Sequence, residues 1–125
     1  MKKKKSLVIL ATIVLIASFC TFAVSAAQPR WTNANSITRN ADPGTDSYRV
    51  VVAGVQGTTK IKITAKLHEK NIFGIFVEKH TTTGTYYSSV ATLVGNYDMS
   101  TNKEYKITGT VEVTANGYTE VINLN

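Results

Sequence analysis

The sequence predicts an all-β protein, a single antiparallel β-sandwich of about six or seven strands. Apolar and polar residues alternate with a period of two over several segments, as they do in half-buried strands. Turn-forming residues recur roughly every 8 to 12 residues, and no segment after residue 26 shows helical periodicity. After removal of the leader described below, roughly 100 residues remain, which is enough for one core and not for two.

The clearest strand is expected over residues 59–69. Its apolar set is Ile61, Ile63, Ala65 and Leu67, and the residues between them are mainly basic. Lys60, Lys62 and Lys66 therefore form one basic stripe on the opposite face. The apolar face requires cover, which we expect from a second sheet about 10 Å away.

The last two strands are expected over residues 105–115 and 118–124. The inward set of the first is Tyr105, Ile107, Val111 and Val113. Gly109 interrupts it, and a glycine in mid-strand marks a bulge or the close approach of a large neighbour, for which Trp31 or a tyrosine is the candidate. Asn116-Gly117 predicts a type I′ hairpin turn, since that turn needs positive φ at both positions.

The first half of the domain gives weaker signals. Residues 28–46 are polar and predict mainly loop, with one ragged edge strand near residues 31–37. Residues 48–55 are apolar on both faces, which predicts a strand in the middle of a sheet. The short turn at residues 56–58 predicts that this strand and the 59–69 strand form an antiparallel hairpin.

Two further strands are expected before residue 95. Residues 73–82 form the first, with Phe73, Ile75 and Val77 inward and Phe76 outward. The threonine-rich segment at residues 81–85 predicts a turn. Residues 86–94 form the second strand, and its register stays open because two apolar phases compete. One phase holds Tyr86, Val90 and Val94, and the other holds Tyr87, Ala91 and Leu93.

The N-terminus has the three parts of a secretory signal peptide. Lys2–Lys5 form a positive segment, residues 7–24 an apolar run, and residues 24–26 a small-residue cleavage motif. We expect residues 1–26 to be removed and residues 27–125 to form the β-sandwich domain, with cleavage after Ala26 or Ala27. A retained membrane anchor is the alternative, because the run is just long enough to span. The predicted location is extracellular, in solution or against the cell wall.

Cleavage would change the charge and the cysteine content. The full chain has a net charge of +6, but the leader holds four lysines, so about +2 remains. We therefore expect no nucleic-acid partner and no stable membrane anchor after cleavage. Cys20 is the only cysteine and lies in the leader, so no internal disulfide is expected. Lipidation of Cys20 is the lesser alternative, because Phe19 is too large for a lipobox.

No residue constellation indicates a reaction, and we expect a protein that is not an enzyme and holds no cofactor or metal. A nucleophilic hydrolase would need Ser or Cys beside His and a carboxylate. His68 and His80 lie on the predicted polar phases, so we expect solvent-facing imidazoles rather than a zinc site with Glu69 or Glu78. These two carboxylates would converge as in a glycosidase only if the chain turned at residues 73–74. The pair of aspartates in residues 42–46 lacks the remaining ligands of a calcium loop.

Binding classes remain, and the predicted contact surface consists of Lys60, Lys62, Lys66 and Phe76. The expected partner is an unknown protein or a cell-surface glycan. An apolar patch of aromatic residues would favour a protein, and coplanar rings would favour a carbohydrate-binding module. A secreted antibacterial or immunity-type protein that acts through its cationic strand face is a further alternative.

Three short motifs carry a resemblance. They are Leu67-His68-Glu69-Lys70, Glu104-Tyr105-Lys106-Ile107 and the Asn116-Gly117 hairpin. In their spacing the chain resembles a group of small secreted proteins of Gram-positive bacteria with no assigned activity, over about 60 residues. The resemblance implies export and an immunoglobulin-like sandwich, and it implies no functional residue.

Overall fold

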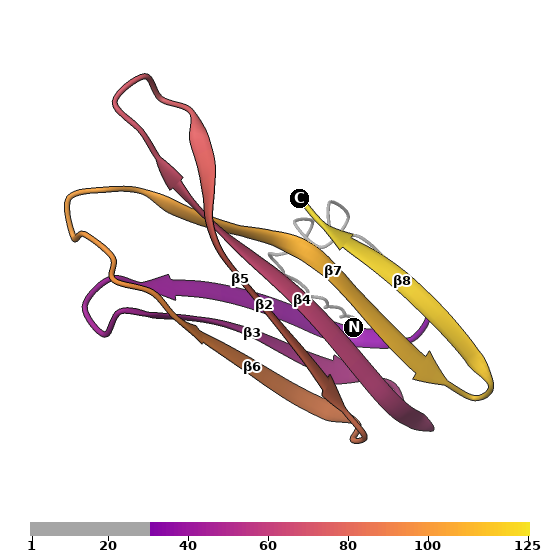
Figure 1. Ribbon diagram of the computed structural model, residues 1–125. Helices are drawn as coiled ribbons and strands as arrows, with labels where there is room; N and C mark the ends of the chain where they lie inside the picture. The colour runs from indigo at the N-terminus through magenta and orange to yellow at the C-terminus, as the bar shows by residue number, and fades with distance from the viewer. Residues whose placement is uncertain (1–30) are drawn as a thin grey trace, which may run out of the picture. The chain divides into compact units, whose positions relative to one another are not determined.

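The computed structural model describes residues 31–125, which form one compact unit of seven strands without a helix (Figure 1). The predicted leader, its cleavage site and Cys20 lie outside the described residues. The strands are β2 (Ala34–Asp42), β3 (Ser47–Gly54), β4 (Thr58–Lys70), β5 (Phe76–Tyr86), β6 (Val90–Asn96), β7 (Tyr105–Ala115) and β8 (Tyr118–Leu124). Over residues 31–125, no helix is long and apolar enough to cross a membrane.

The strands form two antiparallel sheets. One has three strands in the order β2-β3-β6, and the other has four in the order β5-β4-β7-β8 (Figure 1). A single apolar core draws on both sheets, so the all-β fold of two packed layers is confirmed. The fully buried aliphatic side chains at its centre are Val50, Val52, Ile61, Ile63, Leu67, Val111 and Val113.

The regular strands agree with their predicted patterns. All four apolar residues of the β4 phase, Ile61 to Leu67, are buried, and β7 and β8 have the predicted bounds. Asn116 and Gly117 have φ angles of 53° and 82°. Both are positive, as the predicted type I′ turn requires.

The predicted hairpin between the strand at residues 48–55 and β4 is wrong. β3 pairs with β2 and β6, whereas β4 pairs with β5 and β7, so the turn after Gly54 carries the chain from one sheet to the other. In a hairpin, the two strands would belong to the same sheet and their apolar side chains would lie next to each other. Here Val52 and Ile61 belong to different sheets and face each other across one core. The central position predicted for β3 is confirmed.

The edge strand near the N-terminus is longer and later than predicted, because β2 spans Ala34–Asp42 rather than residues 31–37. The buried side-chain amide of Asn33 fixes its start by donating to the carbonyl oxygens of Val113 (2.9 Å) and Tyr118 (2.8 Å). Glu120 accepts the backbone N–H groups of Asn33 (2.7 Å) and Thr32 (3.2 Å). These bonds tie β2 to the β7–β8 hairpin across the two sheets.

The turn predicted at residues 81–85 is wrong, since these residues belong to β5. Threonine is β-branched and favours strands, and an edge strand tolerates polar residues on both faces. His80 and Thr82 point inward, where the Tyr48 hydroxyl lies 2.6 Å from His80 Nδ1 and 2.9 Å from Thr82 Oγ1. The inward polar groups of β5 thus have partners, which a polar segment needs inside a sandwich.

Within β6 the open register is decided in favour of Ala91 and Leu93. The start predicted at residue 86 is wrong, because β6 begins at Val90, Tyr86 ends β5 and packs against the core, and Tyr87 is 80% exposed in the turn between them. Ala91 and Leu93 are buried, whereas Val90 and Val94 are exposed. Gly95 continues the inward phase because the ring of Tyr48 occupies the space of a side chain there. The aromatic ring on β3 therefore selects the phase of β6 that presents no large side chain at this position.

Gly109 allows a close approach, as predicted, but the neighbour is neither Trp31 nor a tyrosine. Its φ is 135°, and a Cβ atom there would overlap the carbonyl oxygen of Thr64 on the paired strand β4. The residue lies opposite Ala65 on β4 and Leu124 on β8. Only glycine fits this point of contact between the strands without displacing the backbone.

Candidate functional site

The hairpin formed by β4 and β5 extends beyond the rest of the four-stranded sheet (Figure 1). The pairing of β4 with β7 ends where Glu69 lies opposite Tyr105, the first residue of β7. Beyond Lys70 and Phe76 the chain has only its own turn, residues 71–75. No second layer of the sandwich covers this segment in the part of the chain that the structure describes.

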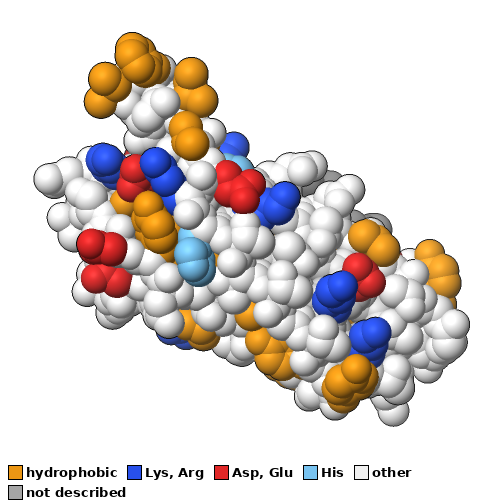
Figure 2. All heavy atoms as spheres, viewed as in Figure 1, with side chains coloured by type: hydrophobic (Ala, Val, Ile, Leu, Met, Phe, Trp, Pro, Cys, Tyr) orange, Lys and Arg blue, Asp and Glu red, His pale blue; other side chains and the backbone are white. Residues whose placement is uncertain are grey.

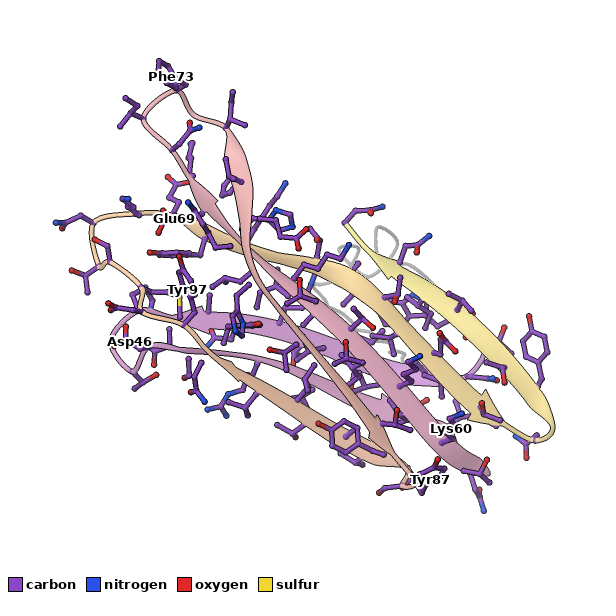
Figure 3. The ribbon with its side chains drawn as sticks, viewed as in Figure 1. Asp46, Lys60, Glu69, Phe73, Tyr87 and Tyr97 are labelled. Carbon is purple, nitrogen blue, oxygen red and sulfur yellow. The ribbon has the colours of Figure 1, made fainter. Side chains whose placement is uncertain are left out.

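Four apolar side chains of this projection are exposed, and we call them the apolar tip. They are Ile72 (92% exposed), Phe73 (79%), Ile75 (59%) and Val77 (40%). Figure 2 shows hydrophobic side chains gathered at the projecting end, and Figure 3 places Phe73 at its outermost point. The inward placement predicted for Phe73, Ile75 and Val77 is therefore wrong. The reversal lies at residues 71–75, with Gly74 at a φ of 78°, and these side chains extend past the core.

The turn that carries the apolar tip is internally hydrogen-bonded. Asn71 Oδ1 accepts the backbone N–H groups of Phe73 (2.9 Å) and Ile75 (3.0 Å). The N–H of Asn71 donates to the carbonyl of Ile75 (2.8 Å), and that of Gly74 donates to the carbonyl of Asn71 (3.0 Å). Four of the five residues of the turn thus have satisfied N–H groups, and the exposed side chains project from an ordered support.

Lysines surround the base of the hairpin, and we call Lys70, Lys79, Lys103 and Lys106 the lysine collar. Phe76 lies on the outer face opposite Lys70, where the Lys106 ammonium stands 4.7 Å and that of Lys70 5.8 Å from its ring centroid. The outward Phe76 is therefore half-covered by lysine side chains. Figure 2 shows basic and acidic groups together at this level.

A groove of about 560 Å³ separates the hairpin from the loop before β7. Glu69, Val77, Lys79 and Lys103 are among its lining residues. Tyr105 fixes the lining carboxylate of Glu69, because the Tyr105 hydroxyl donates to Glu69 Oε2 (2.8 Å) and accepts the N–H of Ser100 (2.7 Å).

Glu69 and Tyr105 influence each other's ionisation. The hydrogen bond from Tyr105 and the ion pair with Lys103 (3.3 Å) hold the pKa of the Glu69 carboxyl below its usual value. Burial raises the pKa of Tyr105, and the negative charge of Glu69 adds to this effect. Both shifts favour an ionised Glu69 beside a neutral Tyr105.

We expect Glu69→Gln to lower the free energy of unfolding at neutral pH by about 1 kcal/mol, because the hydrogen bond from Tyr105 loses its charged acceptor. A depressed pKa stabilises the fold above the unfolded value of about 4.5, and this contribution is lost as pH falls through the folded pKa. The difference between the two proteins should therefore shrink in acid. Urea unfolding at about pH 7 and about pH 3 measures it, and a difference that does not shrink would contradict the assigned role of the charge.

The residues of the predicted contact surface do not gather at one place. Lys60, Lys62 and Lys66 lie along the outer face of β4, and Lys60 is at the end opposite Phe73 (Figure 3). At 3.3 Å per residue, Lys60 is about 33 Å from Lys70, the neighbour of Phe76. The structure brings Phe76 together with Lys70 and Lys106 instead. Asn71 and Gly74 around an apolar run are the sequence signal of an exposed turn that could have located the tip.

The two histidines lie on opposite faces of their sheet. His68 Nε2 is 2.7 Å from Thr108 Oγ1 on the outer face. The solvent-facing position predicted for His80 is wrong, because its ring faces Tyr48 and also lies beside Tyr97, at 5.9 Å between centroids. Within residues 31–125, no three His, Cys, Asp or Glu side chains are placed to hold a metal ion.

The chain does turn near residues 73–74, contrary to the expectation from the sequence, but Glu69 and Glu78 do not converge. Glu69 pairs with Val77, whereas Glu78 pairs with His68. Successive residues of a strand face opposite sides, so the two carboxylates lie on opposite faces of the hairpin. The paired geometry of a glycosidase is therefore absent from this hairpin.

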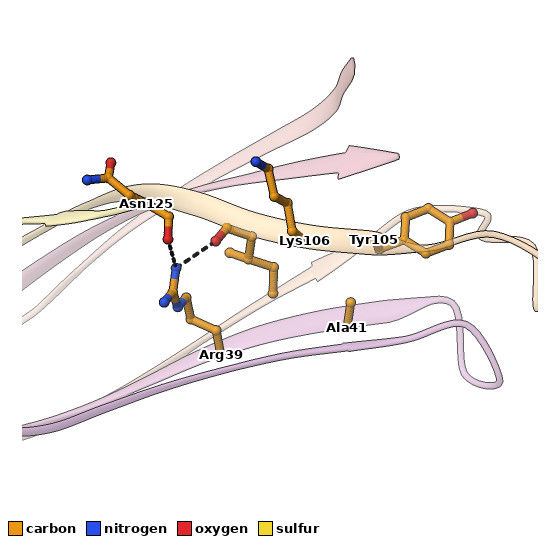
Figure 4. A pocket seen from close by; sticks show the side chains of 6 residues that line it. Arg39, Ala41, Tyr105, Lys106 and Asn125 are labelled. Atoms are coloured by element: carbon orange, nitrogen blue, oxygen red, sulfur yellow. Dashed lines mark hydrogen bonds between the residues drawn. The ribbon is translucent and has the colours of Figure 1, made fainter. Parts of the chain in front are cut away.

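A second cavity, of about 240 Å³, lies between the sheets (Figure 4). The Arg39 side chain lines this cavity, and its Nη1 donates to the carbonyl oxygens of Ile107 (2.9 Å) and Asn125 (3.1 Å). Nη1 of this guanidinium is thus directed at main-chain atoms of β7 and the C-terminal residue. The two hydrogen bonds tie β2 to the other sheet.

The aromatic rings do not form one platform. Tyr48 is buried, and Trp31, Tyr86, Tyr97 and Tyr105 are partly buried against the core. Of the large aromatic residues in the described chain, Phe73, Tyr87 and Tyr118 remain strongly exposed, and they lie in or next to three different turns. Of these three exposed rings, Phe73 is the one that lies within a cluster of exposed apolar side chains, the apolar tip.

Comparison of the chain with protein-family models, with curated proteins and with solved structures found no match in any of the three.

Proposed function

We propose that this protein is a secreted, non-enzymatic binding module that contacts its partner through the apolar tip of the β4–β5 hairpin. The observation that supports this function is the exposure of Ile72, Phe73 and Ile75 on an ordered turn. Soluble proteins rarely leave such a group uncovered unless it meets a partner. Hydrogen bonds that hold the turn reduce the entropy lost when it binds.

An immunoglobulin-like sandwich is the fold proposed for the module. In the immunoglobulin constant-type arrangement, the first, second, fifth and fourth strands form one sheet, and the third, sixth and seventh form the other. The present order has the same members, except that the fourth strand, β5, lies beside the third, β4. This shared order supports the proposal, and the shift of β5 is what creates the projecting hairpin.

Export from a Gram-positive bacterium is the proposed route to the partner. The support is the N-terminal sequence, with Lys2–Lys5, the apolar run and the small residues at 24–27. We expect the full chain to be cleaved after Ala26 or Ala27 and released into the culture medium. Mass spectrometry of the supernatant measures the new N-terminus, and recovery of only the full-length, membrane-bound chain would contradict export.

Binding should depend on the tip rather than on the basic stripe of β4. The released protein is tested on glycan arrays, on purified cell-wall material and on lipid vesicles, together with two variants. Phe73→Ser changes the tip, and the triple change of Lys60, Lys62 and Lys66 to alanine is the control on the outer face of β4, outside the tip. Loss of binding only in Phe73→Ser supports the module.

Loss of binding only in the triple variant would reassign the contact surface to the basic stripe. Turnover of a substrate that is abolished by substitution of His68, His80, Glu69 or Glu78 would overturn the proposal in favour of an enzyme.

A further inference from the structure

We infer that the partner of the apolar tip is the surface of a phospholipid membrane that contains anionic lipid, into which the tip inserts reversibly. This inference rests on the proposed function and names the chemistry of its ligand. It requires no membrane anchor, because the contact is made by one hairpin turn. Three features of the hairpin support it.

The first feature is the convex placement of the apolar side chains. Ile72 and Phe73 are the most exposed residues of the apolar tip. Both belong to the turn at residues 71–75, and Phe73 lies at the outer end of the projecting hairpin (Figure 3). A narrow projection buries little area against a flat protein surface, whereas lipid can surround it. Aliphatic and phenyl side chains at the boundary between headgroups and acyl chains are typical of interfacial binding.

The second feature is the internal hydrogen bonding of the turn. A backbone N–H that loses water in a lipid environment costs free energy unless another group accepts it. The N–H groups of Asn71, Phe73, Gly74 and Ile75 all donate within the turn, two of them to the Asn71 side chain. The turn therefore offers apolar side chains to the membrane while most of its donors are already satisfied.

The third feature is the charge behind the tip. The lysine collar lies around the base of the hairpin, and Lys79 is about 10 Å behind Phe76 along β5. Glu104 and Glu69 lie within 3.4 Å and 3.3 Å of Lys70 and Lys103, and Glu78 accepts a hydrogen bond from Thr81. Among the described residues, no carboxylate lies within 4.0 Å of the Lys79 or Lys106 ammonium group, although Lys79 contributes to the field at Glu69 and Lys106 lies over the Phe76 ring. Because neither ammonium group is held in a close ion pair, both can approach anionic headgroups when the tip is inserted.

The test is binding of the released protein to two kinds of vesicle, phosphatidylcholine alone and phosphatidylcholine mixed with phosphatidylglycerol. We expect Phe73→Ser to lower the partition coefficient for both kinds by about tenfold or more, because an exposed phenyl ring no longer leaves water. Tyr87→Ser is the matched control, since it removes an aromatic ring that is 80% exposed at another turn. It should leave the partition coefficient unchanged.

The charge contribution is tested with Lys79→Gln, for which Lys60→Gln at the far end of the sheet is the control. Each lysine near an anionic surface contributes about fivefold in affinity, so Lys79→Gln should lower binding to the phosphatidylglycerol vesicles by about that factor. Binding to phosphatidylcholine alone should not change. Salt should weaken only the binding to the anionic vesicles.

Insertion itself is measured with Phe73→Trp, which keeps an aromatic residue at the tip. Its fluorescence should shift to the blue on vesicles and be quenched by brominated acyl chains, beyond the signal of Trp31 in the parent protein. Tyr87→Trp should show neither effect. Vesicle binding that is absent, or equal in the parent and Phe73→Ser, would overturn the lipid inference.

The failure of this inference can be distinguished from failure of the proposed function. In one outcome, vesicles bind neither the parent protein nor Phe73→Ser, but Phe73→Ser abolishes binding to a purified protein or glycan, or abolishes self-association in sedimentation. The membrane is then the wrong partner, and the proposed binding module remains supported. If Phe73→Ser changes no binding in any assay, the tip is not a contact surface and both proposals fail.

Discussion

Replacing Gly109 by alanine is expected to remove a large part of the folding stability of the protein. The new methyl group would overlap the carbonyl oxygen of Thr64, and the φ of 135° is itself unfavourable for any residue with a Cβ atom. Relief requires β4 and β7 to move apart at the centre of the four-stranded sheet. We expect a loss of about 4 kcal/mol or more, out of the roughly 5 to 15 kcal/mol that stabilise a small domain.

Gly117→Ala is the matched control for the steric part of this effect. Gly117 also has a positive φ, 82°, but a Cβ atom there would meet nothing within 4 Å. We expect a loss of about 1 to 2 kcal/mol from the backbone conformation alone. Urea midpoints measured by circular dichroism compare the two variants. Equal midpoints would mean that the sheet relaxes around the new methyl group and that the overlap has little cost.

Ile63→Ala should produce the second large effect. Ile63 is fully buried at the middle of β4, between Gly84 on β5 and Val111 on β7. Truncation of a buried isoleucine costs about 2 to 5 kcal/mol, because it removes buried apolar surface and leaves a cavity. The midpoint of thermal unfolding should fall by about 4 to 8 °C for each kcal/mol lost in a domain of this size.

Lys62→Ala is the neighbouring control on the other face of β4, where Lys62 lies opposite Glu112 and Thr85. An outward side chain away from the core should change stability by less than about 0.5 kcal/mol. A midpoint that falls equally in both variants would mean that the faces of β4 are assigned to the wrong sides.

The strands that the sequence predicts well are those with a core on one face and water on the other. Ile61 to Leu67 on β4 and Ile107 to Val113 on β7 alternate because each strand is covered by the opposite sheet. Asn116-Gly117 adds a turn whose geometry depends on two residues alone. These are local signals, so the bounds of β7 and β8 could be predicted without their neighbours.

The pairing of strands is not a local property. Residues 55–58 contain a turn that suits a hairpin as well as a crossing between sheets, and the choice depends on which faces of β3 and β4 share a core. Likewise, residues Thr81 to Thr85 form a strand because β4 pairs with them and because Tyr48 supplies a hydrogen-bond partner for the inward polar groups. The sequence of residues 81–85 does not reveal that β4 and Tyr48 will lie beside them.

The inward placement that the sequence predicts for residues of the apolar tip fails for a physical reason. Phe73, Ile75 and Val77 have the period of an inward phase, and a period identifies a face without showing whether anything covers it. β7 begins only at Tyr105, so the hairpin passes the end of its neighbour before reaching the tip. Phe76 and the lysine at position 70 could be placed on one face from the sequence, but Lys106 joins them through β7, from a distant part of the chain.

The ties between β2 and the other sheet have a mechanical consequence. Asn33 is bonded near the start of β8 through Tyr118 and Glu120, and Arg39 is bonded to Asn125 just beyond its end. A force that stretches the chain between Trp31 and Asn125 would therefore pull β2 and β8 in opposite directions along their lengths. Both ties would carry the load at once and would have to break together, so the unit should resist extension as a body in shear rather than unzip one bond at a time.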